Sequence, residues 1–450
     1  MKWAFAIVST LALAAGGWLL MSSVTDEPEP WTSQSPEALD AFEAGLEDYA
    51  RRYFSDAAVH FYRAMELDPA MVGPKIFLLT LYRPFDEEYQ QILSGLQDQP
   101  LAELSERERF LVQFWRDRLG GEVDAARATL AAYLERFPDD PYALNLECDD
   151  RWDRGQWDEA EACYRRLIEW HPNEVDAQNR LGFLVMMQER FDQAEEYFRT
   201  YRYIAPDVAA PHDALGELYA LVGRYEEADA ALARALAVKA DHCQAHMHRI
   251  ELRNLQGRPE EASALVDRLA EVEGCRYLHD FGYFCAARGW LAYLAGDWQA
   301  VEALHADGAC LDRRGFDMAL HRVALHAGDL ERAREIESGL AIYRQMVEEN
   351  EFGAAASQVA TIERHLEAVR LWTAGDPAAC DAFASADEVA RYWNLDLGAL
   401  KLFNRRHWLR CLEATGDTEQ ATELRRQIEA VNPRFLAGYR VPELPSPLAD

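Results

Sequence analysis

The chain is short of positive charge, and lysine is especially scarce. Its 450 residues include 46 Lys and Arg against 78 Asp and Glu, which gives a formal net charge of −32 at pH 7. The lysines are Lys2, Lys75, Lys239 and Lys401. Affinity for phosphate backbones comes from clustered Lys and Arg, so we expect no nucleic-acid partner. A protein partner with basic groups suits this charge better.

The motifs of common enzymes are also absent. The sequence has no Gly-rich phosphate loop, no G-x-S-x-G nucleophile elbow, no H-E-x-x-H zinc motif and no C-x-x-C pair. We therefore expect a protein that is not an enzyme and that carries no cofactor.

Long uncharged runs are missing except at the N-terminus, where one extends from Trp3 to Met21. As a helix this run spans about 28 Å, close to the thickness of a bilayer's hydrocarbon core. Ala12-Leu13-Ala14 has the A-x-A form of a signal-peptide cleavage site, but the run stays apolar beyond it. Residues 1–21 are therefore either an uncleaved transmembrane anchor, which we favour, or a signal peptide removed on secretion.

Charges around this run predict its orientation. Lys2 precedes it, acidic residues follow it in the polar linker 22–36, and the next cation is Arg51. By the positive-inside rule the N-terminus stays in the cytoplasm. The bulk of the chain is then expected on the periplasmic or other extracytoplasmic side, anchored through residues 3–21.

The strongest pattern present is a period of 34 residues. Alanines recur at this spacing at Ala126, Ala160, Ala194, Ala228 and Ala262. Turn glycines fall in the same register at Gly121, Gly155, Gly223 and Gly257. Such a unit reads as a helix pair, because a small residue allows close approach and a left-handed glycine ends the first helix. One pair cannot bury its apolar face alone, so neighbouring pairs must stack.

These residues resemble the tetratricopeptide repeat, whose pattern is W-x2-L-G-x2-Y followed by A-x3-F, A and P. The fullest match, in residues 209–242, consists of Leu215, Gly216, Tyr219, Ala228, Leu232 and Ala235. The resemblance covers residues 38–71 and 107–276. It implies an all-α fold, a right-handed superhelical solenoid of antiparallel helix pairs, that binds other proteins without catalysing a reaction.

The resemblance also predicts the domain organisation. Residues 37–276 form the repeat solenoid, although the pattern is lost at 72–106, where we expect a pair of helices broken at Pro84. A capping box at Ser105 to Glu108 then begins a new helix. Residues 277–435 are expected to form degenerate repeats that turn at Gly-Asp dipeptides. The Pro-containing tail 436–450 is expected to be disordered.

Eight cysteines in an exported chain suggest disulfides. In a helix hairpin that turns near repeat position 16, position n faces roughly position 32 − n, which brings cysteines together in sequence order. The predicted pairs are Cys148–Cys163, Cys243–Cys275, Cys285–Cys310 and, with looser register, Cys380–Cys411. The alternative is that these cysteines are small buried residues with free thiols.

The resemblance also suggests a binding surface. In tetratricopeptide repeats the first helix of each pair lines the concave face. We call the residues at these positions the groove residues: Tyr142, Asn145, Asp149, Trp152, Asp176, Asn179, Phe183, Met186, Asp213, Glu217, Met247 and Glu251. Their acidic, amide and aromatic groups could bind a peptide segment, or a subunit of a membrane complex, that carries basic groups. The alternative is an ordinary solvated face.

One cluster could instead bind metal, namely His242, Cys243, His246 and His248. His242 and His246 are four residues apart and share a helix face, which suits zinc. A His-rich helix start with Cys243 in a disulfide explains the same residues, so we assign no metal. The alternative function is a ligand- or metal-binding sensor, or an accessory protein of an envelope enzyme or secretion system.

Overall fold

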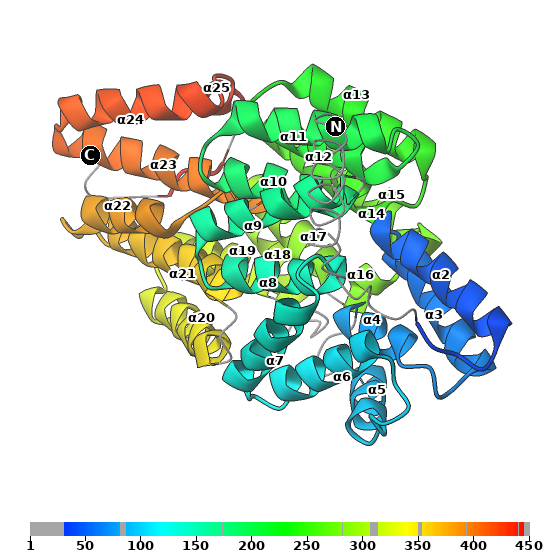
Figure 1. Ribbon diagram of the computed structural model, residues 1–450. Helices are drawn as coiled ribbons and strands as arrows, with labels where there is room; N and C mark the ends of the chain where they lie inside the picture. Colours follow the sequence, from blue (N-terminus) through cyan, green and yellow to red (C-terminus); the bar gives the residue numbers. More distant parts are fainter. Residues whose placement is uncertain are drawn as a thin grey trace, which may run out of the picture. The chain divides into compact units, whose positions relative to one another are not determined.

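The computed structural model describes residues 31–81, 87–172, 174–280, 282–306, 314–349, 353–392, 394–439 and 441–444. Every regular element in these ranges is a helix (Figure 1). The chain divides into two compact units. The first comprises residues up to 49 together with 56–147, and the second comprises 50–55 together with 148–450.

The first unit is built from short helices around an aromatic core. They are α2 (Pro36–Ala50), α3 (Phe54–Leu67), α4 (Gly73–Leu81), α5 (Glu87–Gln97), α6 (Glu106–Leu119), α7 (Val123–Arg136) and the start of α8 (Pro141–Asp153). Phe42 and Phe61 are fully buried in this core. A Cβ atom on Gly45 would lie 2.5 Å from the Phe61 ring, so only glycine allows this close helix approach.

The predicted capping box at the start of α6 is confirmed. The Ser105 hydroxyl accepts a hydrogen bond from the Glu108 amide, and the Glu108 carboxylate accepts one from the Ser105 amide at 3.0 Å. The same buried carboxylate also accepts the Thr32 amide at 2.8 Å and the Thr32 hydroxyl at 2.6 Å. The cap therefore also holds the segment that precedes α2.

The second unit begins with regular helix pairs. These are the end of α8, α9 (Trp157–Trp170), α10 (Val175–Met187), α11 (Phe191–Ile204), α12 (Ala209–Leu221), α13 (Tyr225–Val238), α14 (Cys243–Leu255) and α15 (Pro259–Ala270). Gly182 meets Phe198 as Gly45 meets Phe61, with an added Cβ only 2.2 Å from the ring. The repeat pattern thus predicts the helix contacts as well as the helix order.

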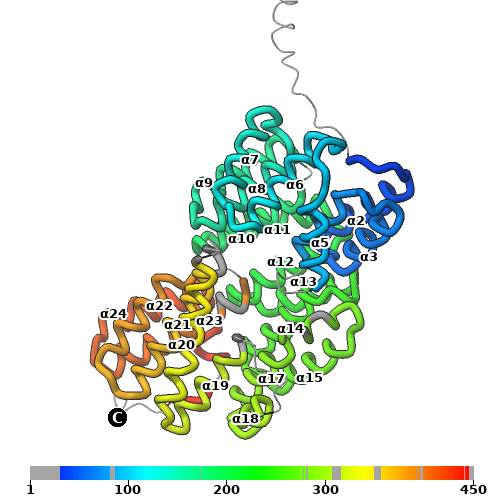
Figure 2. The backbone as a smooth tube through the Cα atoms, turned by 90° about the horizontal axis from the view of Figure 1, so that it is seen from below, coloured from blue at the N-terminus to red at the C-terminus, as the bar shows by residue number. Residues whose placement is uncertain are grey.

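Helices continue beyond residue 276. The elements are η1 (Glu273–Cys275), α16 (Tyr277–Asp280), α17 (Tyr283–Leu294), α18 (Trp298–Ala306), α19 (Arg314–His326), α20 (Leu330–Glu349), α21 (Gly353–Thr373), α22 (Ala379–Val389), α23 (Leu395–Thr415), α24 (Thr418–Val431) and α25 (Phe435–Gly438). Figure 2 shows α19 to α24 as one stack. The glycines of the four Gly-Asp dipeptides adopt positive φ at the turns.

The end of the chain folds back on the repeats of the second unit. Helix α23 packs against α12 and α14. Phe403 and Tyr439 share one buried core with Leu215 and Leu252 of those repeats. Tyr439 and Leu444 of the predicted tail are 4% and 3% exposed. That the tail 436–450 is disordered stays a prediction.

The predicted membrane anchor, residues 3–21, lies outside the described residues. Among the helices that the structure describes, none combines the length and the apolar character needed to cross a bilayer. The anchor, like the export that it implies, stays a prediction.

Candidate partner-binding site

The groove residues lie on the first helices of successive pairs, α8, α10, α12 and α14. Tyr142 and Asn145 belong to the first unit and the other ten to the second. In the first unit, the Tyr142 ring packs edge-on against Trp31 at 5.6 Å, and the Arg107 guanidinium lies 5.2 Å from its centroid. Tyr142 is therefore partly committed to the packing of its own unit.

Two of the acidic groove residues share an arginine. The Arg180 Nε atom donates to Asp176 Oδ2 at 3.2 Å, and Arg180 Nη2 lies 3.7 Å from Asp149 Oδ2. Tyr164 donates its hydroxyl to Asp149, and Arg52 Nη1 donates to Asp176 Oδ1 at 3.1 Å. Burial raises the pKa of Asp176, but Arg180 and Arg52 outweigh it and hold the pKa below its usual range. These carboxylates already have cationic partners within the chain.

Asp213 and Glu217 on α12 are also engaged internally. His248 Nδ1 donates to Asp213 Oδ1 at 2.8 Å, and His242 Nε2 lies 3.6 Å from Asp213 Oδ2. Glu217 accepts the backbone amide of Leu395 at 2.6 Å. Burial raises the pKa of Asp213, but the facing His248 and His242 outweigh it and hold the pKa well below its usual range. This group joins α12, α14 and the start of α23.

Burial divides the groove residues into two sets. Asn179, Met186, Asp213 and Glu217 are 4%, 0%, 6% and 3% exposed. These four offer no surface to a partner in this structure. For Glu217 the cause is the N-terminal end of α23, because its carboxylate accepts the Leu395 amide there. Sequence reasoning could not foresee this contact, because it comes from a segment about 180 residues further along the chain.

The accessible set lies mainly on α8 and α10. The Asp149 and Asp176 side chains are 39% and 29% exposed. Trp152 and Phe183 are half-buried, with their rings edge-on to Tyr164 at 6.2 Å and to Phe198 at 5.0 Å. Met247 and Glu251 on α14 are also half-buried. That these residues bind a partner stays a prediction.

A further residue, Glu189, was missed by sequence reasoning. It occupies the turn position where other repeats have glycine, and its φ is +62°. A side chain in this left-handed region is strained, so the residue needs a compensating interaction. The Glu189 carboxylate lies 3.4 Å from both Lys401 Nζ and Arg405 Nη2 on α23. The break in the glycine column was the signal that could have revealed this contact.

A cavity of about 610 Å³ lies next to this turn, between the start of α11 and the ends of α12 and α24. Its arginines are already paired. Arg190 Nη1 donates to Glu161 Oε2 at 2.7 Å, and Arg224 Nη1 donates to Glu195 Oε2 at 2.7 Å. The cavity therefore has no cation free for an acidic ligand.

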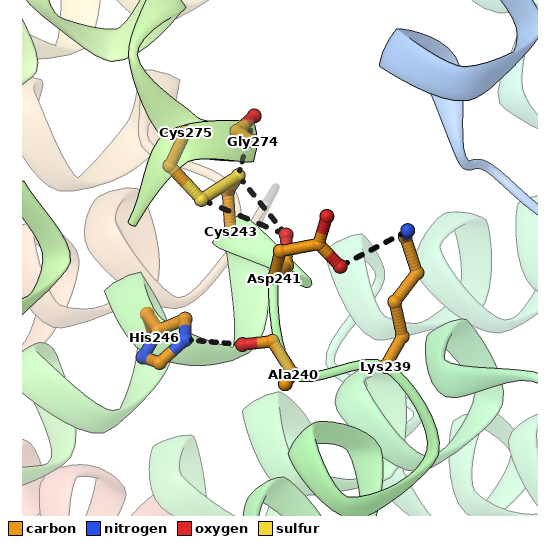
Figure 3. Close-up of a disulfide and its surroundings, with 7 residues drawn as sticks. All are labelled: Lys239, Ala240, Asp241, Cys243, His246, Gly274 and Cys275. Carbon is orange, nitrogen blue, oxygen red and sulfur yellow. Dashed lines mark hydrogen bonds and ion pairs between the residues drawn. A yellow bond between two sulfur atoms is a disulfide. The ribbon is translucent and has the colours of Figure 1, made fainter. Parts of the chain in front are cut away.

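The structure separates the residues of the possible metal cluster. Cys243 is bonded to Cys275, and His246 Nε2 is 2.9 Å from the Ala240 carbonyl oxygen (Figure 3). His242 and His248 approach Asp213 instead. In the part of the chain that the structure describes, no group of three His, Cys, Asp or Glu side chains is placed to hold a metal ion. The metal alternative has no support here.

Three of the four predicted disulfides are present. They are Cys148–Cys163, Cys243–Cys275 and Cys380–Cys411. Cys310 of the fourth predicted pair lies outside the described residues, and the described cysteines include no free thiol. Cys148 occupies the position at which Gly45 and Gly182 approach an aromatic ring, so a covalent bond replaces that contact in its repeat.

The chain is similar to known repeat profiles and, more distantly, to solved structures. Two tetratricopeptide-repeat family profiles match residues 145–209 and 212–242. No curated protein matches the chain. Among solved structures, a tetratricopeptide repeat protein from Parabacteroides merdae ATCC 43184 has 13% identity and a TM-score of 0.36, covering 60% of this chain and 93% of its own. The APC/C hetero-tetramer Cut9–Hcn1 has 13% identity and a TM-score of 0.48, with 94% and 82% covered. This chain therefore contains tetratricopeptide repeats within an all-helical, solenoid-like fold.

Proposed function

We propose that this protein is a non-catalytic interaction scaffold that docks a protein segment on the accessible groove residues of α8 and α10. Its tetratricopeptide repeats support this role, because stacked helix pairs present long surfaces. We further propose that residues 3–21 hold the scaffold at the extracytoplasmic face of a membrane, with secretion after cleavage as the alternative.

The accessible set on α8 and α10 is the observation that carries the docking proposal. Trp152 and Phe183 are half-buried aromatic side chains, the kind that anchors protein interfaces. Asp149 and Asp176 beside them are partly exposed and ion-paired, which suits a polar rim that steers approach. A segment with one apolar side chain and flanking basic groups fits this surface.

The disulfides support the proposed location. Such bonds persist in oxidising compartments and are rare in the reducing cytosol. The bonds at Cys148, Cys243 and Cys380 each tie together residues of the helical repeats. An exported chain gains stability from them, whereas a cytosolic chain would keep the thiols reduced.

Site-specific crosslinking in native membranes tests the docking proposal. A photo-reactive phenylalanine analogue replaces Trp152 in the full chain, and the same analogue replaces Tyr203 as the matched control. Tyr203 lies near the end of the second helix α11 and is 86% exposed, so it is more accessible than Trp152 but outside the groove. Crosslinked products are identified by mass spectrometry.

We expect one defined product from position 152 and none of the same identity from position 203. Asp149→Asn should lower the yield at position 152, with a larger loss at low salt than at high salt. Equal products from both positions, or no product from position 152, would contradict docking on α8 and α10. Asp213 and Glu217 are unsuitable for this test because their side chains are buried.

A further inference from the structure

Arg322 on α19 is a fully buried cation with no acidic partner. Its exposure is 0%, and no carboxylate of the described residues forms an ion pair with it. Burial lowers its pKa to about 10, so the guanidinium remains charged at neutral pH. The ring of Phe403, 5.3 Å away, offers only partial compensation. A buried charge is normally paired, because leaving it alone in the interior is costly.

A chain of hydrogen bonds shows that the histidine next to Arg322 is neutral. Arg322 Nη2 donates to His365 Nε2 at 2.6 Å, and His365 Nδ1 donates to Asn404 Oδ1 at 2.9 Å. Asn404 Nδ2 in turn donates to the Phe383 carbonyl oxygen at 2.9 Å. Since His365 Nε2 must accept, this ring is neutral. Arg322 Nε and Nη1 keep their hydrogens without any acceptor among the described residues.

His407 on α23 is a second buried group beside the ring of Phe403. It is 4% exposed, its ring lies 4.6 Å from Phe403, and neither ring nitrogen has a hydrogen-bond partner within the described residues. Burial, with Arg322 and His365 nearby, lowers the pKa of His407 well below its usual value. Arg406 and Arg410 act in the same direction. The surroundings are thus positive, inside a chain of net charge −32.

We propose that the donors of Arg322 and His407, around Phe403, form a buried site for one monovalent anion of the size of chloride or formate. Such an anion would accept from Arg322 Nε and Nη1 and from a protonated nitrogen of His407. It would neutralise the buried guanidinium. The contributing helices α19, α21 and α23 lie in the part of the chain after the regular repeats.

Anion titration of the full chain tests this site. The melting temperature Tm is measured in potassium gluconate, whose anion is too large, with chloride, bromide or formate replacing gluconate at constant ionic strength. We expect Tm to rise by about 5 °C when the small anion reaches a hundredfold excess over its dissociation constant. Crystals grown in bromide should show an anomalous peak within hydrogen-bond distance of Arg322.

A matched pair of variants separates the site from general salt effects. Arg322→Met removes the unpaired cation, and Arg405→Met removes a buried arginine that is paired with Asp387 at 2.9 Å and 3.0 Å. In gluconate, Arg322→Met should melt no lower than the wild type, because it relieves a buried charge. Its Tm should no longer respond to chloride. Arg405→Met should melt lower in every salt and keep the full response.

Three outcomes would overturn the proposal. If Tm responds equally to chloride in Arg322→Met and in the wild type, the anion acts elsewhere on the protein surface. If bromide crystals show only water beside Arg322, its N–H groups donate to water and not to an anion. A Tm that does not change with the anion would remove the site altogether. The bromide measurement needs no variant, so a folding defect cannot obscure the result.

Discussion

Two buried ionisable clusters of the second unit differ in how a buried charge is partnered. In the repeats, Asp213 is surrounded by His242 and His248, with contacts of 3.6 Å and 2.8 Å. In the later helices, Arg322 faces the neutral His365 and keeps two nitrogens without acceptors among the described residues. Asp213 thus has two histidine partners within the chain, whereas Arg322 has no carboxylate partner among the described residues.

The difference shows where to look for ligands in this fold. Asp213 sits at a predicted groove position, yet its charge is used to join helices of the same chain. Arg322 sits in helices without a clear repeat pattern, yet it lacks a counter-charge among the described residues. A position in the repeat register therefore indicates which surface a side chain belongs to, and its partners decide whether it is available.

Asp213→Ala should have the largest effect on stability. It removes the acceptor of a buried group, and leaves His242 without its carboxylate and His248 with only the Glu217 carboxylate at 3.6 Å, so we expect the free energy of unfolding to fall by about 3 kcal/mol. Denaturant unfolding measures this loss. Glu196→Ala on α11, at an exposed position, is the control and should change stability by less than about 0.5 kcal/mol. A loss below about 1 kcal/mol for Asp213→Ala would remove the contrast between the clusters.

The pH dependence of stability tests the same contrast at the cluster around Arg322. Burial holds the pKa values of His365 and His407 well below their usual value. An unfolded chain takes up these protons below about pH 6.5, and the folded chain does not. Stability contributed by the neutral rings is therefore present above that pH and is lost as the pH falls. Each ring lowers the free energy of unfolding by up to about 1.4 kcal/mol for each pH unit below that value.

His407→Phe isolates one of these contributions. Phenylalanine can keep the stacking on Phe383, whose ring lies 5.9 Å from that of His407. It also removes two polar atoms that have no hydrogen-bond partner among the described residues. At pH 7.5 we expect a gain of up to about 1 kcal/mol, because a buried unsatisfied group is lost. Between pH 6 and pH 5, the variant should lose less stability than the wild type. Parallel pH curves would show that His407 is protonated in the folded state.

The smallest expected effect on stability is at Glu189, whose carboxylate connects the regular repeats to α23. Glu189→Gln keeps the strained turn but loses the charge that faces Lys401 and Arg405, and should cost roughly 0.5 kcal/mol because the carboxylate is 43% exposed and screened by solvent. Glu189→Gly loses the same charge but relieves the left-handed strain, so it should be about 1 kcal/mol more stable than Glu189→Gln. Thermal unfolding of both variants checks this order. The reverse order would mean that the turn is not strained.

Much of the local architecture followed from residue spacing. The helix pairs, the glycine turns and the capping box at Ser105 depend on neighbours within one or two turns of helix, and such rules are visible in sequence. The disulfides at Cys148, Cys243 and Cys380 followed from the register of helix hairpins. These bonds join residues 15 to 32 positions apart, well within the reach of the repeat rule.

The candidate site was less predictable. Trp152 and Phe183 lie partly accessible on the first helices, whereas Asn179 and Met186 on the same surface are buried. Helical periodicity selects a face but carries no information on which distant segment covers it. The same limit holds for α23, which packs against α12 although the two helices are nearly 200 residues apart in the chain.

By itself, the sequence determined the helical repeat, its 34-residue period, the turns and the cysteine pairs, because each depends on short-range sterics and hydrogen bonding. Only the tertiary structure decided which charges are paired, which groove residues remain accessible and that Arg322 Nε and Nη1 lack an acceptor among the described residues. These properties depend on burial and on contacts between segments far apart in the chain, where the low dielectric of the interior makes an unpaired charge costly.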